Sequence, residues 1–296
     1  MIDFLLSRYF VSIITFTSVT VIAVIGIYIL TGLTGLFSLG HGAFMAIGAY
    51  VAGVLMVNTN IPFFLAVIIA LLVSLIAGAV IALPCIKLRR DYIALVTFGF
   101  GEAITAFLRQ TATITGGASG LSGIPAKTTP VLAILSVIVI IIIARKFKFS
   151  RLGRQCLAIR NDELAAKSMG INVAKVKFKA FMFSSAVVAY AGILYAFYTR
   201  YVDPGMFGWT LSAEWLIMVF VGGVNSLTGA VLASVFLSGI PEALRFAAAW
   251  RVVLYSLLIL MILNFRPKGI FGDKEFSFKH FGMIKKYFKG DEGNVN

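Results

Sequence analysis

The interval from Tyr9 to Ile86 contains no Lys, Arg, Asp or Glu, and its one remaining ionisable side chain of the usual charged types is that of His41. A helix that crosses the hydrocarbon core of a membrane needs about 20 mostly apolar residues. The interval is therefore long enough for three membrane-spanning helices and the turns between them. Across the whole chain 13% of residues are charged, whereas about a quarter are charged in soluble domains. We predict a polytopic α-helical membrane protein.

The first apolar run is expected to stay in the protein as a membrane-spanning helix. Asp3 and Arg8 precede a run from Tyr9 to Leu30. This run is longer than the roughly 7–15 residues of a signal-peptide core, and no small-x-small cleavage site follows it at the usual distance. A removable signal peptide is therefore not expected.

Nine apolar segments are separated by turn or charge signals. They are Tyr9–Leu30, His41–Val57, Pro62–Leu83, Tyr92–Leu108, Val131–Ala144, Lys179–Tyr198, Leu211–Gly223, Thr228–Leu244 and Arg251–Phe265. The pattern predicts an all-α transmembrane bundle of eight to ten spans. Glycine-rich stretches such as "TGLTGLFSLGHG" and "VGGVNSLTG" indicate either close helix packing or short broken helices that line a path.

Basic residues are concentrated in three regions, which are 87–91, 145–178 and the tail from Arg266. Between Arg145 and Lys179 there are ten Lys or Arg residues and two acidic ones. Loops rich in Lys and Arg stay in the cytoplasm, so we expect these regions to lie inside. The net charge of +14 is then a sign of topology. Nucleic-acid binding is not expected, because it would require a soluble basic face.

No residue pattern predicts a catalytic, cofactor or metal site. Cys85 and Cys156 lie next to basic segments, so we expect them to be reduced and to act as small apolar residues. The two histidines, His41 and His280, have no ligand-like spacing. The chain has no G-x-x-x-x-G-K-[ST] phosphate loop, and no strand precedes the G-x-G of "GFGEAI". We therefore expect a protein that is not an enzyme and holds no cofactor or metal.

The central stretch "IRNDELAAKSMGINVAKVKFKAF" (159–181) is charged and helix-patterned. We expect Asn161 to cap a short helix that begins with Asp162 and Glu163, where acids favour the helix dipole. Lys167 follows Glu163 at i+4 and is its expected partner. Gly170 suits the left-handed position after a helix, and Asn172 is the expected cap of the next one. A two-turn helix is unstable alone, so this one either docks on a partner or belongs to a solvated linker.

A resemblance to a known family rests on this stretch and on several others. The segment "RLGRQCLAIRNDELAAKSMGINVAKVKFKAF" resembles the cytoplasmic loop of ABC-importer permeases, with Glu163, Ala165, Ala166 and Gly170 at its signature positions and Leu164 interposed. "GLFSLGHGAFMAIGAYVAG", "IKLRRDYIALVTFGFGEAI", "TGGASGLSGIP", "YVDPGMF", "MVFVGGVNSLTGAVLAS" and "FRPKGIFG" follow in an order similar to that of the LivM-type permeases of branched-chain amino acid importers. The resemblance extends over most of the stretch from Gly32 to Gly272.

The resemblance implies a permease domain over 1–272, with a coupling loop at 145–178 and a basic cytoplasmic tail at 273–296. It also implies a multi-pass protein of the cell membrane that pairs with a paralogous permease, two cytoplasmic ATP-binding subunits and an extracytoplasmic substrate-binding protein. The short helix would be the coupling helix, held in a groove of an ATPase. The residues expected to couple to the ATPase are Arg154, Arg160, Asp162, Glu163, Ala165, Ala166, Gly170 and Ile171.

Candidate residues of the translocation path are Ser38, Gly40, His41, Glu102, Gly116, Gly117 and Glu214. Each has a structural alternative. Glu102 could pair with Arg109, Glu214 could favour the first turn of its helix, and Ser38 could cap the helix that His41 begins. The glycine loop could face a passing carboxylate through free N–H groups, or it could dock the binding protein.

Three other functions compete with branched-chain amino acid import. A related permease for urea, amides or other amino acids would have a similar chain, because the binding protein largely sets selectivity. An ion-coupled secondary transporter would need acids placed for ions within the spans, and this chain has few. A membrane-embedded enzyme would need a catalytic constellation that the spans lack.

Overall fold

Helix α10 (Val173–Thr199), with 27 residues, is the longest helix and lies at the centre of the bundle. The computed structural model describes residues 8–59, 61–88, 90–243, 250–266, 269–270 and 272; the expected tail at 273–296 lies outside them. α10 packs against α2 (Arg8–Ile27), α3 (His41–Asn58) and α4 (Phe63–Cys85). α3 and α10 approach closely at two glycines. A Cβ on Gly48 would lie 2.2 Å from the Ala189 oxygen, and one on Gly192 would lie 2.0 Å from the Met45 oxygen.

Within the described part of the chain, seven helices are long and apolar enough to cross a membrane. They are Tyr9–Gly32, His41–Asn58, Phe63–Cys85, Tyr92–Gln110, Pro130–Phe149, Val173–Thr199 and Pro204–Gly222, and two shorter apolar helices cover Leu227–Pro241 and Val253–Phe265. These nine segments coincide with the nine apolar runs of the sequence. The prediction of an all-α polytopic bundle is confirmed, and the chain is a multi-pass membrane protein.

Helices α4 and α7 (Pro130–Phe149) each expose a row of apolar side chains. Phe64, Leu72 and Ile76 of α4 and Leu135 and Ile142 of α7 are all at least half exposed. Such a surface is costly in water but suits lipid, because an all-apolar helix needs an apolar surrounding. These faces therefore suit a membrane environment.

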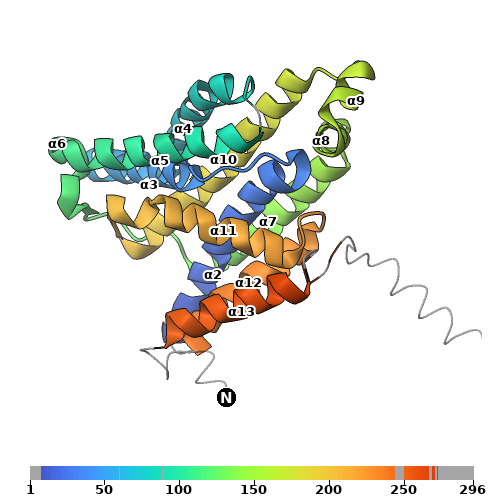
Figure 1. Cartoon of the computed structure of the whole chain (residues 1–296). Helices are drawn as coiled ribbons and strands as arrows, with labels where there is room; N and C mark the ends of the chain where they lie inside the picture. Colours follow the sequence, from blue (N-terminus) through green and yellow to red (C-terminus); the bar gives the residue numbers. More distant parts are fainter. Residues whose placement is uncertain are drawn as a thin grey trace, which may run out of the picture.

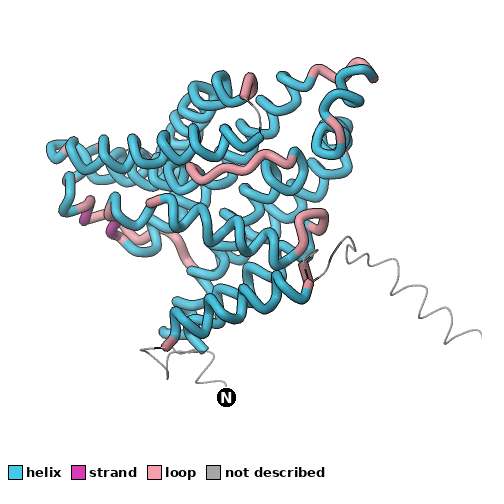
Figure 2. Tube along the Cα trace, in the orientation of Figure 1, coloured by secondary structure: helices cyan, strands magenta, loops and turns pink. Residues whose placement is uncertain are grey.

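The connection between α2 and α3 is irregular and buried. α2 continues into a short π-helix, η1 (Tyr28–Gly32), and residues 35–40 then run without helical structure to α3. Figure 2 shows this segment as a loop that passes through the body of the bundle. Non-helical backbone is tolerated at membrane depth where protein covers it. A Cβ on Gly40 would lie 2.0 Å from the Thr97 oxygen, so only glycine allows this loop to rest on α5 (Arg90–Gln110).

The two ends of the bundle differ (Figure 1). One end carries α8 (Arg151–Asn161) and α9 (Glu163–Ser168), together with the first turns of α10; we call it the basic end. The opposite end carries α6 (Ala112–Thr115), η2 (Gly117–Ser119) and a two-stranded antiparallel sheet, in which β1 (Leu121–Ser122) pairs with β2 (Tyr201–Val202). We call it the strand end.

Four further elements complete the described chain. η3 (Pro204–Phe207) follows β2 and leads into α11 (Trp209–Gly222). α12 (Leu227–Ala243) and α13 (Arg251–Phe265) follow, and both pack against α11. α11 and α12 also pack against α2, so α2 lies between the α10 group and this second group of helices, as Figure 1 shows.

Candidate functional site

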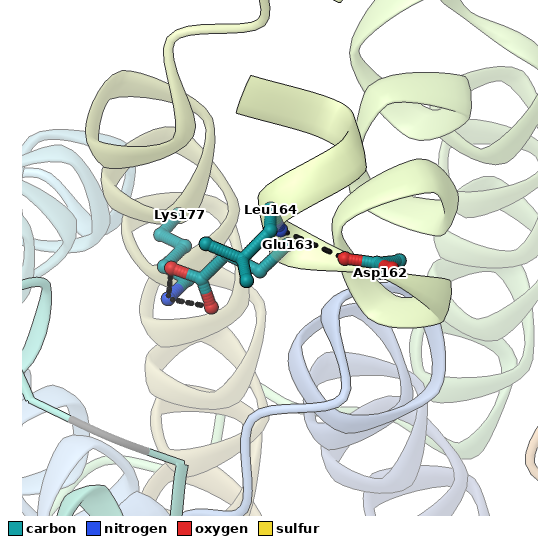
Figure 3. Close-up of polar contacts among 4 residues, drawn as sticks. All are labelled: Asp162, Glu163, Leu164 and Lys177. Atoms are coloured by element: carbon teal, nitrogen blue, oxygen red, sulfur yellow. Dashed lines mark hydrogen bonds and ion pairs between the residues drawn. The ribbon is translucent and has the colours of Figure 1, made fainter. Parts of the chain in front are cut away.

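Helix α9 is capped at its N-terminus by Asp162 (Figure 3). One carboxylate oxygen, Oδ1, accepts from the backbone N–H groups of Leu164 at 2.8 Å and Ala165 at 3.0 Å. The expectation that Asn161 is the cap is wrong, because α8 extends through Asn161 and the extended backbone needed by a cap falls one residue later. The charge of Asp162 also complements the positive end of the helix dipole.

The C-terminus of α9 is closed by a Schellman motif. Gly170 has φ +80°, as the sequence predicted for this position. Its N–H donates to the Lys167 oxygen at 3.0 Å, and the N–H of Ile171 donates to the Ala166 oxygen at 3.1 Å. Asn172 then caps α10 by accepting from the Lys175 N–H at 3.0 Å, also as predicted. This six-residue helix is therefore held at both ends by its own chain.

Gly170→Val will loosen α9. A Cβ at Gly170 meets no atom within 4 Å, so the cost is backbone strain alone, about 1–2 kcal/mol for a left-handed residue with a side chain. We expect amide hydrogen exchange over 163–171 to speed up about 5- to 30-fold. Gly170→Asn is the matched control, because asparagine tolerates this conformation. Equal exchange rates in the valine and asparagine variants would contradict the claim that the left-handed backbone of Gly170 is what strains the valine variant.

Glu163 forms a bidentate ion pair with Lys177 of α10, with both carboxylate oxygens 2.8 Å from Nζ (Figure 3). The prediction that Glu163 pairs with Lys167 at i+4 is therefore wrong. The Lys177 side chain is 2% exposed and that of Glu163 is 42% exposed. A buried ammonium needs a counter-ion, so tertiary packing selects Lys177 over the exposed Lys167. The pair fastens α9 to the first turns of the central helix.

The apolar side chains of α9 and its C-terminal turn face two ways. Ala166 is 4% exposed and belongs to the buried core of this chain. Little of its surface is therefore left for a partner to contact directly. Leu164 and Met169, in contrast, are 77% and 84% exposed. Sequence reasoning omitted both from the coupling residues.

Arg160 and Lys148 fasten the basic end to the turn between α11 and α12. Arg160 donates to the Gly32 oxygen at 2.6 Å and to the side-chain oxygen of Asn225. Lys148, which is buried, donates to the Tyr28 hydroxyl at 2.9 Å and to the Asn225 backbone oxygen. Gly32 and Tyr28 belong to η1. Two cations thus join α7 and α8 to the π-helix and to the α11–α12 turn.

The other predicted coupling residues lie around α9. Ala165 is exposed, and Ile171 is half-buried. Arg154 is exposed, donates to the Phe149 oxygen at 2.9 Å, and lines a shallow depression together with Arg151, Gln155 and Ile171. Cys156 is a free and fully buried thiol whose pKa is raised by burial to about 12. A thiolate is therefore scarce at Cys156, and labelling reagents would miss it on either side of a membrane.

His41 is fully buried at the crossing of α2, α3 and α10. Its Nδ1 lies 2.7 Å from the Ser38 Oγ, and its Nε2 lies 2.7 Å from the Ser184 Oγ. The Ser184 hydroxyl donates to the Gly26 oxygen at 2.6 Å, so it must accept from Nε2–H, which leaves Nδ1 to accept from Ser38. Ser38 is therefore a ring partner, and Gly40 occupies the helix cap that was expected for Ser38. The arrangement joins three helices.

The glycine loop at the strand end uses its N–H groups internally. Gly116 and Gly117 have φ +77° and +60°. The Gly116 N–H donates to the Ala112 oxygen at 3.1 Å, and the Gly117 N–H donates to the Thr115 hydroxyl at 3.3 Å. Both N–H groups are thus occupied. The geometry shows a turn that carries β1 towards β2.

The two acids within the membrane-spanning helices, Glu102 and Glu214, are both exposed. Glu102 is exposed on α5, and among the described residues no ion pair joins it to Arg109, whose guanidinium lies beside Gly205. Glu214 lies in the second turn of α11, because the helix begins at Trp209; the expected first-turn role is therefore wrong. Glu214 lines a cavity between α2, α11, α12 and α13.

These features define a multi-pass membrane protein with a short capped helix, α9, at its basic end. The family model described as "Branched-chain amino acid transport system / permease component" matches residues 9–263. The chain belongs to this family.

Two relatives agree with this assignment, and a solved structure shares the fold. The high-affinity branched-chain amino acid transport system permease protein LivM of Salmonella typhimurium is 31% identical over 90% of this chain and 71% of its own length. The LivH permease protein of the same organism is 24% identical over 88% of this chain and 94% of its own length. PsaBC from Streptococcus pneumoniae, solved in complex with Fab, has a similar fold, with a TM-score of 0.51 and 18% identity over 88% of this chain and 94% of that one.

Proposed function

We propose that the chain is the membrane-spanning permease subunit of an ATP-driven importer of branched-chain amino acids. It forms part of the translocation path and does not hydrolyse ATP itself. Two ATP-binding subunits bind at the basic end, which lies in the cytoplasm because loops rich in Lys and Arg stay there. The family of the chain and the names of its relatives support this substrate class.

The observation that carries the proposal is the exposure of Leu164 and Met169 on α9 and its C-terminal turn. Burying one such side chain in an interface contributes about 1.5–3 kcal/mol. At the basic end, away from lipid, two apolar side chains that are more than three-quarters exposed indicate a surface that a protein partner covers. The capped and braced helix presents both side chains rigidly, which lowers the entropy cost of docking.

Two connections would carry a movement of α9 into the membrane. The Glu163–Lys177 pair fastens α9 to α10, and α10 packs on three membrane-spanning helices. Arg160 connects α8 to the α11–α12 turn through Asn225 and to η1 through Gly32. ATP-driven closure of the partner subunits would therefore move both helix groups. Coupling through contiguous packed elements of this kind is the physical basis of long-range transmission.

The remaining partners are a second permease and an external binding protein. Both a LivM and a LivH permease protein of Salmonella typhimurium are similar to this chain, which favours pairing of two paralogous permeases over pairing of two copies. The strand end, on the far side from α9, would receive the binding protein.

Reconstitution tests this function directly. The chain, its paralogue, the two ATPases and the binding protein would be placed in proteoliposomes with ATP inside or outside. We expect uptake of L-leucine that requires both ATP and the binding protein. Uptake of urea or short amides in place of leucine would favour the related-permease alternative. Uptake that needs a sodium or proton gradient and no ATP would refute the proposal.

Labelling of an introduced cysteine tests the orientation. Met169→Cys places a thiol at an 84% exposed position. We expect a membrane-impermeant maleimide to label it in inside-out vesicles and not in intact cells. Thr113→Cys, at an exposed residue of the strand end, is the matched control and should label from outside. The native cysteines are both buried and can stay in place. The reverse pattern would invert the topology.

A further inference from the structure

An open groove with a volume of about 580 Å³ lies between α4, α7 and α10. It arises because α7 packs mainly on α2, whereas α4 packs on α3 and α10. All three helices are long and apolar enough to cross a membrane, so the groove lies at membrane depth. We call it the α7–α10 groove; it is lined from Val131 to Ile143 on α7 and from Phe183 to Tyr190 on α10.

The walls of the α7–α10 groove are mostly apolar. Ile140 of α7 and Val187 of α10 are buried and form its floor. Leu135 and Val139 are at least half exposed and form its rim. Apolar surface of this kind is best covered by an apolar ligand.

The polar side chains of the groove are already used within the chain. The Ser136 hydroxyl donates to the Leu132 oxygen at 2.7 Å, so it accepts from the Tyr190 hydroxyl, which lies 2.8 Å away. Thr129 caps α7 by accepting from the Leu132 N–H at 3.3 Å. These hydroxyl groups therefore do not require a polar ligand, and the occupant of the groove is a hydrocarbon.

The length of the groove matches one leaflet of a membrane. Val131 and Ile143 both line it, and at a rise of about 1.5 Å per residue they lie about 18 Å apart along α7. Half of the hydrocarbon core of a bilayer is about 15 Å thick. A single acyl chain that enters from the basic end would therefore lie along the groove for most of its length.

Two lysines flank the groove where it approaches the basic end. Lys146 follows Ile143 of α7 by three residues, and Lys179 precedes Phe183 of α10 by four residues. Residues at these spacings share one face of a helix. The two helices meet just there, because the Phe147 ring stacks on the Phe183 ring at 4.7 Å. Both lysines are exposed, so two ammonium groups flank one end of an apolar groove.

This combination of charge and apolar surface favours one class of ligand. Basic pockets between membrane-spanning helices on the cytoplasmic side take anionic lipid headgroups. A zwitterionic headgroup is less well matched, because it brings a cation of its own close to the two lysines. A second permease seated on this face would have to pair both ammonium groups or bury them at a cost. The charge therefore points to an anionic lipid.

We propose that the α7–α10 groove binds an acyl chain of an anionic phospholipid and that Lys146 and Lys179 bind its headgroup phosphate. The bound chain fills the gap between α7 and α10, which are the two helices that α8 and α9 connect. The lipid thereby braces the helix that leads into the basic end. This inference goes beyond the proposed function and is independent of the transported substrate.

Photo-crosslinking in nanodiscs tests the site. The assembled complex would be placed in nanodiscs that contain either phosphatidylglycerol or phosphatidylcholine, each with the same diazirine-bearing acyl chain. Peptide mass spectrometry then locates the adducts. At equal mole fraction we expect about tenfold more adduct on 131–143 and 183–190 with phosphatidylglycerol, since each lysine near the membrane surface attracts an anionic lipid several-fold.

Substitutions at the two lysines test the headgroup contact. Lys146→Gln with Lys179→Gln should lower phosphatidylglycerol labelling about tenfold, to the phosphatidylcholine level. Phosphatidylcholine labelling should not change, which shows that the groove is intact. Arg145→Gln is the matched control, because Arg145 is exposed but lies two residues from Ile143 and so faces away from the groove; labelling should stay within about twofold. Lys146→Arg with Lys179→Arg keeps both charges and should keep the full preference.

Three results would overturn the proposal. Equal labelling of the wild type by both lipids would refute the headgroup contact. A preference for phosphatidylglycerol that is lost in the arginine variant, or kept in the glutamine variant, would show that the two charges do not select the lipid. An assembled complex without adducts in the groove would show that a protein covers it, and a disulfide between Val139→Cys and the paralogous permease would then identify this face as a permease interface. None of these results depends on transport, so they leave the import function to its own test.

Discussion

Replacing both Leu164 and Met169 by aspartate will abolish recovery of the ATPase subunits with this chain and reduce ATP-driven uptake to background. Docking of the wild type buries two apolar side chains that are 77% and 84% exposed in the chain alone, which contributes about 1.5–3 kcal/mol each. The variants lose this contribution and place two carboxylates in the interface, where each unpaired charge costs several kcal/mol. The expected loss exceeds the stability of most transient interfaces.

Co-purification of the ATPases from membranes measures this effect, with uptake as the second readout. Membrane insertion should be unchanged, because neither side chain belongs to the buried core of the chain. Thr113→Asp, which adds a charge at an exposed residue of the strand end, is the control and should retain the ATPases. Wild-type recovery of ATPase with the double variant would show that α9 is a solvated linker, and the coupling assignment would fail.

Ala166 shows which features of the short helix α9 the sequence could predict and which it could not. The pattern located the helix, its glycine stop and the cap of α10, since these depend on residues a few positions apart. The direction each side chain faces depends on where α8 and α10 lie. Ala166→Asp would bury a charge inside this chain, because Ala166 is 4% exposed, so it would damage the permease itself and could not report on a partner.

The fold was more predictable than the site. Each of the nine apolar runs corresponds to a helix in the described part of the chain, because in lipid every backbone group must be satisfied within a helix and hydropathy reports this directly. The π-helix at Tyr28–Gly32 and the buried loop at 35–40 left no clear periodic signal. Their stability comes from distant groups, such as the Thr97 side chain, which accepts from the Leu39 N–H at 3.1 Å.

Glu214 was misplaced for a related reason. The sequence predicts that the apolar run containing Glu214 begins at Leu211, whereas α11 begins at Trp209. A shift of two residues moves a side chain by more than half a helical turn, which separates a residue near the helix terminus from one that lines a cavity. The partners α2, α12 and α13 that enclose this cavity are distant in sequence, so no local pattern indicates it.

A double-mutant cycle on Glu163 and Lys177 will show that the ion pair holds α9 in place. Glu163→Gln alone leaves the Lys177 ammonium, which is 2% exposed, without its counter-ion. Removing one partner of a buried pair costs about 3–5 kcal/mol. We expect about 3 kcal/mol, because Glu163 is 42% exposed and water screens part of the attraction. Lys177→Met alone should cost less, about 1 kcal/mol, because the remaining carboxylate can be solvated.

The double variant Glu163→Gln with Lys177→Met should recover most of the loss, since a buried methionine needs no counter-ion. Amide hydrogen exchange over 163–171 measures the free energy, and uptake measures the consequence for coupling. Lys175→Met is the matched control, because Lys175 is exposed and lies two residues from Lys177; its effect should stay within about 0.5 kcal/mol. Additive losses in the double variant would mean that the two side chains act independently and that α9 transmits force to α10 by another contact.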